Sequence, residues 1–361
     1  MTLSKKQLSI MVFFIPLVFK MAMLPSLFYQ VSNTDSYIGI GVMTALEFLQ
    51  LWLILFLVSK GGIRGIKEIY GINVARAVAL PLLFVMGVKS IIFLTEIYTY
   101  ICDFLFYNIS STPVILALLI VIFYLAFKGI KAIGHVFELS IWIIPLIAIF
   151  GVVFGKFYLN SDYLEPLFVD GAGAMFKGID TYIIYAFDFS PLLLFQIEKK
   201  KNLAVVITSI SCILVTTALY VVLIANYGRA TFLVNGAFAR LASFNTVVSE
   251  IGSLDWPSAL LWITTATGSL ALKFAAMGEI LKLFKVKKQY GIGATCIVIG
   301  ILTMFVFPGL KEVLKLATGP VRYVTIALEI AVPIVVLALY AADKYRTDNS
   351  KNTEGKIETQ N

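Results

Sequence analysis

The chain has 361 residues, of which 60% are hydrophobic and 14% charged, and its formal net charge is +8. Soluble globular proteins are about half apolar and about a quarter charged, so this composition excludes a soluble enzyme and indicates an integral membrane protein. The basic residues lie in short segments between apolar runs and not on one surface, which excludes a nucleic-acid-binding protein.

A membrane-spanning helix needs about 20 predominantly apolar residues, and the sequence supplies about ten such runs. In chain order the predicted spans are 7–31, 37–59, 77–106, 113–127, 135–155, 173–197, 203–226, 256–281, 290–308 and 320–342. Residues 1–342 therefore form a single predicted membrane domain in contact with the lipid bilayer. Residues 343–361 are polar and charged, and we expect them to form a disordered tail.

The segments between the spans predict the orientation of the chain. If the N-terminus is cytoplasmic and the spans alternate, most of the 29 lysines and arginines fall in cytoplasmic segments, as the positive-inside rule requires. Both termini are then cytoplasmic, and the protein belongs to the cell (inner) membrane. The inner segment 60–76 is amphipathic and suits the lipid headgroups, and the outer segment 227–255 is predicted to form a cap of short helices.

Ionisable residues deep inside the spans are candidate functional residues, because a charge in hydrocarbon is costly. Acids outnumber bases among them, so some acids are either protonated or in a wet cavity, as a proton-coupled device requires. The alternative is that several are protonated carboxyls that serve packing. The deep residues are Lys20, Glu47, Lys89, Glu96, Glu138, Asp188 and Glu329, with Asp103, Lys273 and Glu279 nearer the span ends.

Spans 1 and 6 share a pattern in which a charge precedes a proline. Lys20 lies five residues before Pro25, and Asp188 lies three residues before Pro191. A proline inside a helix frees the carbonyl four residues earlier, and interrupted helices at matching positions of two halves point to a transporter's binding site. The alternative is two ordinary proline kinks.

Span 3 carries Lys89, Glu96 and Asp103 at intervals of seven residues. Residues spaced by seven share one face of a helix, and that face must look into the bundle. We expect Lys89 to find a partner in Asp188 or Glu47. Span 8 contains TTATGSLALK, whose small hydroxyl residues favour close helix packing, and a ligand-lining role for Thr264 is the alternative.

Other chemistry is predicted to be absent. The three cysteines lie in apolar segments without CxxC spacing, and His135 is the single histidine, so a histidine-rich metal site is excluded. The sequence contains no serine–histidine–acid triad, Walker loop or GxGxxG motif. We therefore predict no enzymatic activity, no cofactor and no metal.

Three stretches of the sequence resemble a known family. These are KGIKAIGHVFELSIWIIPLI, YLEPLFVDGAGAMFKG and YAFDFSP, within about residues 125–195, and they resemble the B subunits of spore germinant receptors. That family belongs to the amino acid/polyamine/organocation transporter superfamily. The resemblance implies an all-α fold with a five-plus-five inverted repeat (LeuT-like), with halves of about 7–155 and 173–342 and broken helices 1 and 6.

The resemblance also implies a ligand site between spans 1, 3, 6 and 8. At the span 1 break the superfamily favours small, glycine-rich sequence, whereas this chain has Lys20, which pairs either with a ligand carboxylate or with Asp188. We expect Glu96 or Glu138 to carry a coupling proton. The predicted ligand-binding residues are Lys20, Met21, Ala22, Met23, Lys89, Phe187, Asp188, Phe189, Ser190 and Thr264.

The expected function follows from the same resemblance. The chain is expected to bind an amino acid or similar small germinant in the spore inner membrane, with a large membrane A-type subunit and a lipoprotein C-type subunit as partners. Two alternatives stay open. One is a proton-coupled amino-acid transporter that works alone, and the other is a structural membrane subunit without a ligand.

Overall fold

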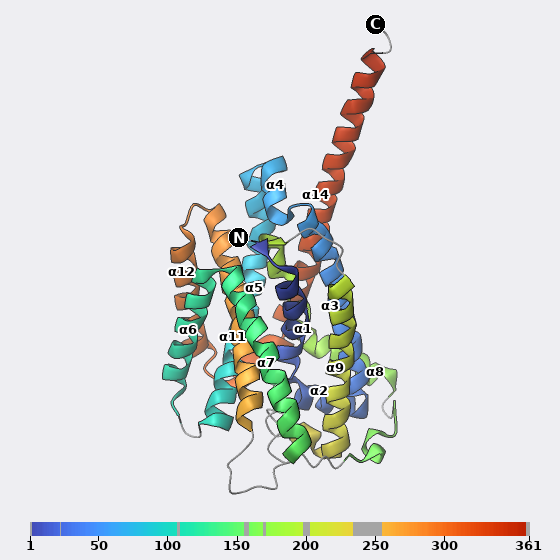
Figure 1. The fold of residues 1–361 in the computed structure, drawn as a ribbon, viewed down its shortest axis with the longest axis vertical. Coiled ribbons are helices and arrows are strands. Elements are labelled where there is room, and N and C mark those ends of the chain that lie inside the picture. Colours follow the sequence, from blue (N-terminus) through green and yellow to red (C-terminus); the bar gives the residue numbers. More distant parts are fainter. Residues whose placement is uncertain are drawn as a thin grey trace.

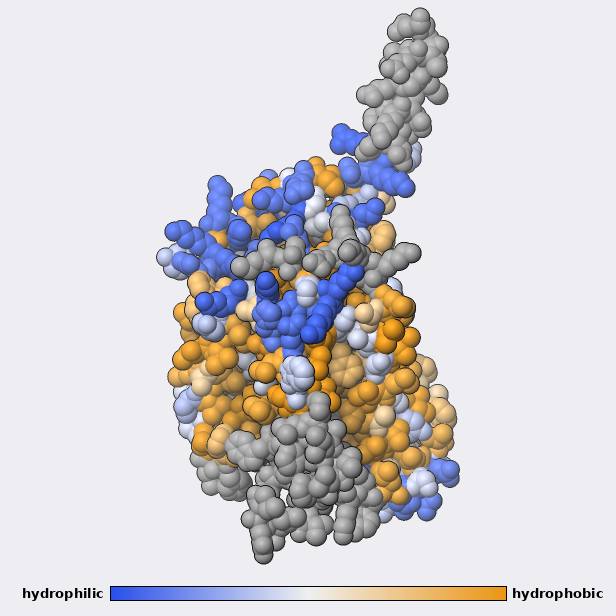
Figure 2. All heavy atoms as spheres, in the orientation of Figure 1, coloured by the Kyte–Doolittle hydropathy of each residue, from blue (hydrophilic) through white to orange (hydrophobic). Residues whose placement is uncertain are grey.

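A computed structural model describes residues 2–21, 23–106, 109–154, 159–168, 171–197, 203–233 and 255–358. This part of the chain is a bundle of helices with two very short strands (Figure 1). On the face drawn in Figure 2, hydrophobic side chains surround the middle of the bundle, and polar ones gather mainly at the end that carries α4 and the C-terminus. The prediction of an all-α membrane protein is confirmed.

Within the described residues, seven helical segments are long and apolar enough to cross a membrane. The count of ten spans and the inverted repeat stay predictions. The helices within the predicted spans are α1 (Lys5–Lys20), α2 (Leu24–Ser32), α3 (Ser36–Ser59), α5 (Ile72–Tyr100), α6 (Ser111–Lys128), α7 (Ile130–Phe154), α8 (Ala172–Tyr182), α9 (Leu203–Tyr227), α11 (Asp255–Leu283), α12 (Lys288–Ile301) and α14 (Val321–Glu358). Helices α2 and α8 are short: α2 follows α1 in the first predicted span, and α8 begins the sixth.

Shorter elements connect these helices. Strand β1 (Thr2–Leu3) pairs in parallel with strand β2 (Gln196–Ile197), which joins the start of the chain to the segment before α9. The predicted outer cap at 227–255 begins as a 3₁₀ helix, and its residues 234–254 lie outside the described residues. The other short helices are α4 (Gly62–Tyr70), α13 (Leu310–Thr318), η1 (Asn33–Asp35), η2 (Ile101–Leu105), η3 (Ser161–Leu164), η4 (Ile183–Tyr185), η5 (Ser190–Leu194), η6 (Gly228–Leu233) and η7 (Leu302–Val306).

Two of the predicted spans are interrupted near the charges that the sequence singled out. Helix α1 ends at Lys20 and α2 begins at Leu24, with Pro25 in its first turn. After α8 the chain leaves the α-helical path, Phe187 has a φ of 67°, and Pro191 lies in the first turn of η5. Proline suits a first turn because no intrahelical donor is needed there. Each proline therefore starts a new helical segment and does not kink a continuous one.

The carbonyls at the end of α1 are bonded to side chains of other helices. The Tyr220 hydroxyl of α9 donates to the Lys20 carbonyl at 2.7 Å, and the Trp262 indole of α11 donates to the Val18 carbonyl at 2.7 Å. The last carbonyls of a helix have no intrahelical partner, and in lipid they need one from elsewhere in the protein. These two bonds make an interruption at this depth tolerable.

The end of the chain differs from its prediction. Helix α14 continues to Glu358, so residues 343–358 are helical where the sequence predicted disorder, and this part projects away from the bundle (Figure 1). Ala341 and Ala342 are strong helix formers, and neither proline nor glycine occurs between them and Gly355. No strong helix breaker therefore stops the helix before Gly355.

A tight contact between α4 and α14 gives a first testable expectation. A Cβ at Gly65 would collide with the hydroxyl of Tyr340, which donates to the Gly62 carbonyl at 2.8 Å. We expect Gly65→Ala to lower the free energy of unfolding by about 1 kcal/mol, since that hydrogen bond is lost. Gly87→Ala in α5 is the matched control, because a Cβ there meets nothing within 4 Å. Thermal unfolding in detergent should show a lower midpoint for the first variant only.

Candidate functional site

The interruptions bring a set of charged side chains together in the centre of the bundle. We call it the charged cluster, and each of its side chains is at most 2% exposed. Its residues come from α1, α3, α5, the interrupted segment after α8, α11 and α14. They are Lys20, Glu47, Lys89, Asp188, Lys273 and Glu329.

Glu47 of α3 links the two interruptions. One carboxylate oxygen pairs with the ammonium of Lys20, and the other accepts the backbone N–H of Asp188 at 3.0 Å. In this structure Lys20 therefore pairs with Glu47 and not with Asp188. A single buried carboxylate holds the end of α1 beside the irregular backbone at Asp188.

Lys89 of α5 contacts two carboxylates of the cluster and a backbone carbonyl. Its ammonium donates to the Ala186 carbonyl at 2.5 Å and lies 3.3 Å from Asp188 and 2.9 Å from Glu329. The expected partnership with Asp188 is therefore present. The Ala186 carbonyl belongs to irregular backbone, so Lys89 compensates both for two negative charges and for an acceptor without a helical partner.

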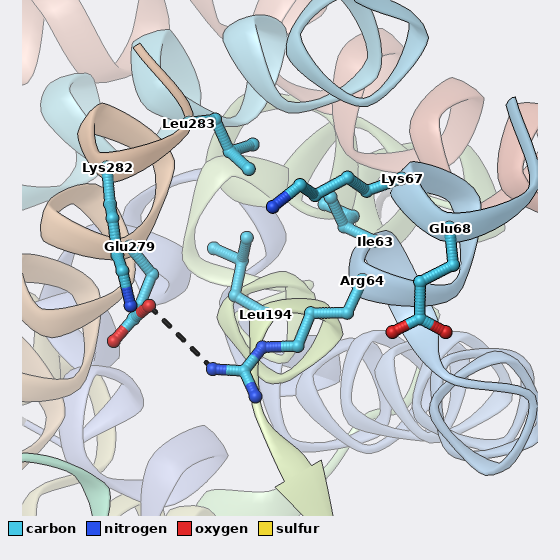
Figure 3. A pocket seen from close by; sticks show the side chains of 8 residues that line it. All are labelled: Ile63, Arg64, Lys67, Glu68, Leu194, Glu279, Lys282 and Leu283. Atoms are coloured by element: carbon cyan, nitrogen blue, oxygen red, sulfur yellow. Dashed lines mark ion pairs between the residues drawn. The ribbon is translucent and has the colours of Figure 1, made fainter. Parts of the chain in front are cut away.

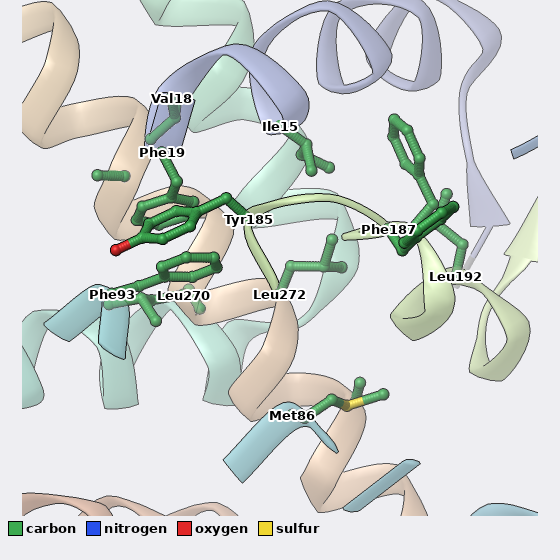
Figure 4. Packing of buried hydrophobic residues seen from close by; sticks show 14 of the residues in the cluster. Ile15, Val18, Phe19, Met86, Phe93, Tyr185, Phe187, Leu192, Leu270 and Leu272 are labelled. Atoms are coloured by element: carbon green, nitrogen blue, oxygen red, sulfur yellow. The ribbon is translucent and has the colours of Figure 1, made fainter. Parts of the chain in front are cut away.

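Lys273 of α11 reaches the same aspartate from another side. Its ammonium lies 3.2 Å from Asp188 and 3.4 Å from the hydroxyl of Ser269. It also lies 4.6 Å from the ring centre of Phe93 and 5.3 Å from that of Phe19. The two rings are stacked at 3.5 Å with an interplanar angle of 6°, and Figure 4 shows them together with Tyr185.

Glu96 lies at the edge of the cluster, two helical turns beyond Lys89 on α5. One oxygen accepts the hydroxyl of Tyr185 at 2.5 Å, and the other has no hydrogen-bond partner among the described residues. The described ion pairs include none to Glu96, and its side chain is fully buried. Glu96 thus differs from the other buried acids of this region, each of which contacts a lysine.

The charges of this region nearly cancel. Three lysine ammonium groups face the carboxylates of Glu47, Asp188 and Glu329, and Glu96 is one further acid. Isolated charges at this depth are costly, and removing one partner of a buried pair destabilises a protein by about 3–5 kcal/mol. If the carboxyl group of Glu96 is uncharged, the positive and negative charges of this region are equal in number without any ligand.

The remaining predicted site residues fall into two groups. Met21, Met23, Phe187 and Phe189 are buried beside the cluster, and the Ser190 hydroxyl donates to Glu329 at 3.3 Å. Ala22 lies outside the described residues.

Thr264 and Glu138 lie away from the cluster. Thr264 lines an apolar groove with residues such as Ile101 and Val136. Glu138 pairs at 2.7 Å with His135, which is 61% exposed.

Four residues of the region were not among the predicted site residues. Glu47 was expected as one of two possible partners of Lys89 and pairs instead with Lys20. Glu329 carried the signal of a midspan charge without any indication of its partner, which is Lys89. Lys273 was placed nearer a span end; it lies ten residues before the end of α11, and its side chain is buried. Tyr185 carried no signal, because a tyrosine in an apolar run reads as a core aromatic.

A cavity lies at each end of the bundle. At the α4 end, a cavity of about 490 Å³ is lined by Ile63, Arg64, Lys67, Glu68, Leu194, Glu279, Lys282 and Leu283 (Figure 3). Arg64 and Glu279 face each other across it at 3.9 Å. At the α8 end, a cavity of about 810 Å³ is lined by the end of α2, the η3 loop and η6. The α4-end cavity touches Leu194, six residues after Asp188 on the same interrupted segment.

The sequence was compared with known proteins. Neither the models of known protein families nor the curated proteins match it.

Proposed function

We propose that this chain binds an amino acid or similar small zwitterion at the charged cluster, as the permease-like B subunit of a spore germinant receptor. The observation that carries the proposal is the meeting of two helix interruptions at buried, opposite charges. Lys20 ends one helix, Asp188 follows the other interruption, and Glu47 contacts both. Opposite charges and irregular backbone at membrane depth are what a small charged ligand requires of its site.

The α4-end cavity supports access to this site, because it contains charged side chains and touches Leu194 on the segment that follows Asp188. The α8-end cavity also contains charged side chains and lies at the opposite end of the bundle. A receptor needs access from one side, and a transporter needs access from both. Both functions place the ligand at the same cluster.

A stand-alone proton-coupled transporter is the second candidate function. It is favoured by Glu96, a buried acid that lacks a lysine partner among the described ion pairs and is joined to the interrupted segment through Tyr185. Labelled amino-acid uptake into liposomes that depends on a proton gradient would support transport. Binding without uptake would support a receptor.

Asp188→Asn tests the ligand site. We expect it to weaken binding of labelled amino acids to the purified full-length chain by at least about tenfold, because a charge-assisted hydrogen bond contributes about 1.5–3 kcal/mol. Scintillation proximity binding with a mixture of labelled amino acids measures this on the monodisperse fraction.

Asp180→Asn is the matched control for this experiment. Asp180 also pairs with a cation, Arg322 at 2.7 Å, but its side chain is 51% exposed and lies on α8 away from the cluster. Its substitution should leave binding unchanged. Equal binding by Asp188→Asn and the wild type would remove the charged cluster as the ligand site.

A further inference from the structure

The surroundings of the Lys273 ammonium have the composition of a recognition site for an organic cation. A carboxylate oxygen of Asp188 lies at 3.2 Å, the Ser269 hydroxyl at 3.4 Å, and the rings of Phe93 and Phe19 at 4.6 and 5.3 Å. Proteins bind ligand ammonium groups with this combination of an anion and aromatic faces. In this structure the ammonium group between these side chains is that of Lys273.

One acceptor at this place is unused. The Oδ1 atom of Asp188 is shared by Lys89 and Lys273, whereas its buried Oδ2 atom has no hydrogen-bond partner among the described residues. A buried acceptor without a donor is costly. The lysines therefore leave one oxygen of this carboxylate able to accept a further N–H donor.

We propose that Lys273 occupies a site for a primary ammonium group, and that an amine-bearing ligand enters by displacing it from Asp188. This inference rests on the proposed function and assigns the ammonium end of its zwitterionic ligand to Asp188 and the carboxylate end to Lys273. A zwitterion gives its ammonium to Asp188 and its carboxylate to the displaced Lys273, so one buried ion pair is exchanged for two. A plain amine would leave Lys273 without an anion, which is costly at this depth.

Lys273→Ala with n-propylammonium tests the site directly. The truncation removes three carbons and the ammonium, and n-propylammonium has the same groups. We expect this probe, present from membrane extraction onward, to raise the yield and the unfolding midpoint of Lys273→Ala with rising concentration, since binding to the native state stabilises it. The wild type should need at least about tenfold more probe, because its tethered ammonium competes at an effective concentration on the order of millimolar.

Two controls separate recognition of the ammonium from filling of a cavity. The neutral 1-propanol has the same number of heavy atoms and should not stabilise Lys273→Ala. The double variant Lys273→Ala/Asp188→Asn keeps the space but removes the anion, and n-propylammonium should not stabilise it. The proposal is overturned if Lys273→Ala is not improved by the amine, including by failing to fold in its presence, or if either control responds equally.

The same experiment distinguishes this inference from the proposed function. Stabilisation of Lys273→Ala by n-propylammonium, together with absent amino-acid binding by the wild type, would establish the ammonium site and reject the amino-acid ligand. Amino-acid binding by the wild type without stabilisation of Lys273→Ala would support the ligand and overturn the displacement of Lys273.

Discussion

Lys89→Met should lower the free energy of unfolding by about 3–5 kcal/mol, because it leaves two buried carboxylates without their shared cation. The variant loses the cation between Asp188 and Glu329, and it also loses the donor to the Ala186 carbonyl. Methionine has a similar length and fills the same space, so the loss reports charge and not packing. Thermal unfolding of the full-length chain in detergent measures it.

A second substitution checks the cause of that loss. Glu329→Gln placed on top of Lys89→Met removes one of the two negative charges left behind, so it should recover part of the lost stability. On the wild-type background the same Glu329→Gln should be destabilising, because it leaves Lys89 with one anion fewer. Additive losses in the double variant would contradict an electrostatic origin.

Glu47→Gln and Glu96→Gln should have opposite outcomes, although both side chains are fully buried. In Glu47→Gln the ammonium of Lys20 loses its anion, and we expect a loss of about 3 kcal/mol or more. Glu96 has no lysine partner among the described ion pairs, and a glutamine there still accepts the Tyr185 hydroxyl. Glu96→Gln should therefore leave the unfolding midpoint within about 0.5 kcal/mol of the wild type.

Glu96→Gln also tests whether Glu96 carries a coupling proton. If Glu96 carries a coupling proton, Glu96→Gln remains folded and binds ligand, but its response to ligand no longer depends on pH between mildly acidic and neutral conditions. Tyr185→Phe is the companion variant, because it removes the hydrogen bond and keeps the acid. An unchanged pH profile in Glu96→Gln would reject Glu96 as the coupling residue.

The sequence was sufficient to locate the interruptions and most of the buried charges. Proline next to a midspan charge is a local signal, so Lys20 and Asp188 could be recognised without knowledge of the fold. Helical spacing likewise placed Lys89 and Glu96 on one face of span 3. These inferences succeed because they need only one helix at a time.

The pairing of the charges could not be predicted in the same way. Which helix faces which depends on packing, so Lys20 was expected near Asp188 or a ligand and is paired with Glu47 of α3. Lys273 was placed nearer a span end, and its burial depends on the helices that pack around α11, which the sequence of one helix does not reveal. Glu138 shares the depth signal of Glu96 but pairs with the exposed His135, and depth alone does not distinguish the two.

The short pairing of β1 with β2 has a mechanical consequence. Thr2–Leu3 precedes α1, and Gln196–Ile197 follows η5, so the backbone bonds between them fasten the α4-end halves of both interrupted segments to each other. On the opposite side of the interruptions, α2 and α8 pack against each other, with the rings of Phe28 and Tyr182 at 6.1 Å. The two interrupted segments are thus held to each other at both ends of the bundle, by backbone bonds at the α4 end and by side-chain packing at the α8 end.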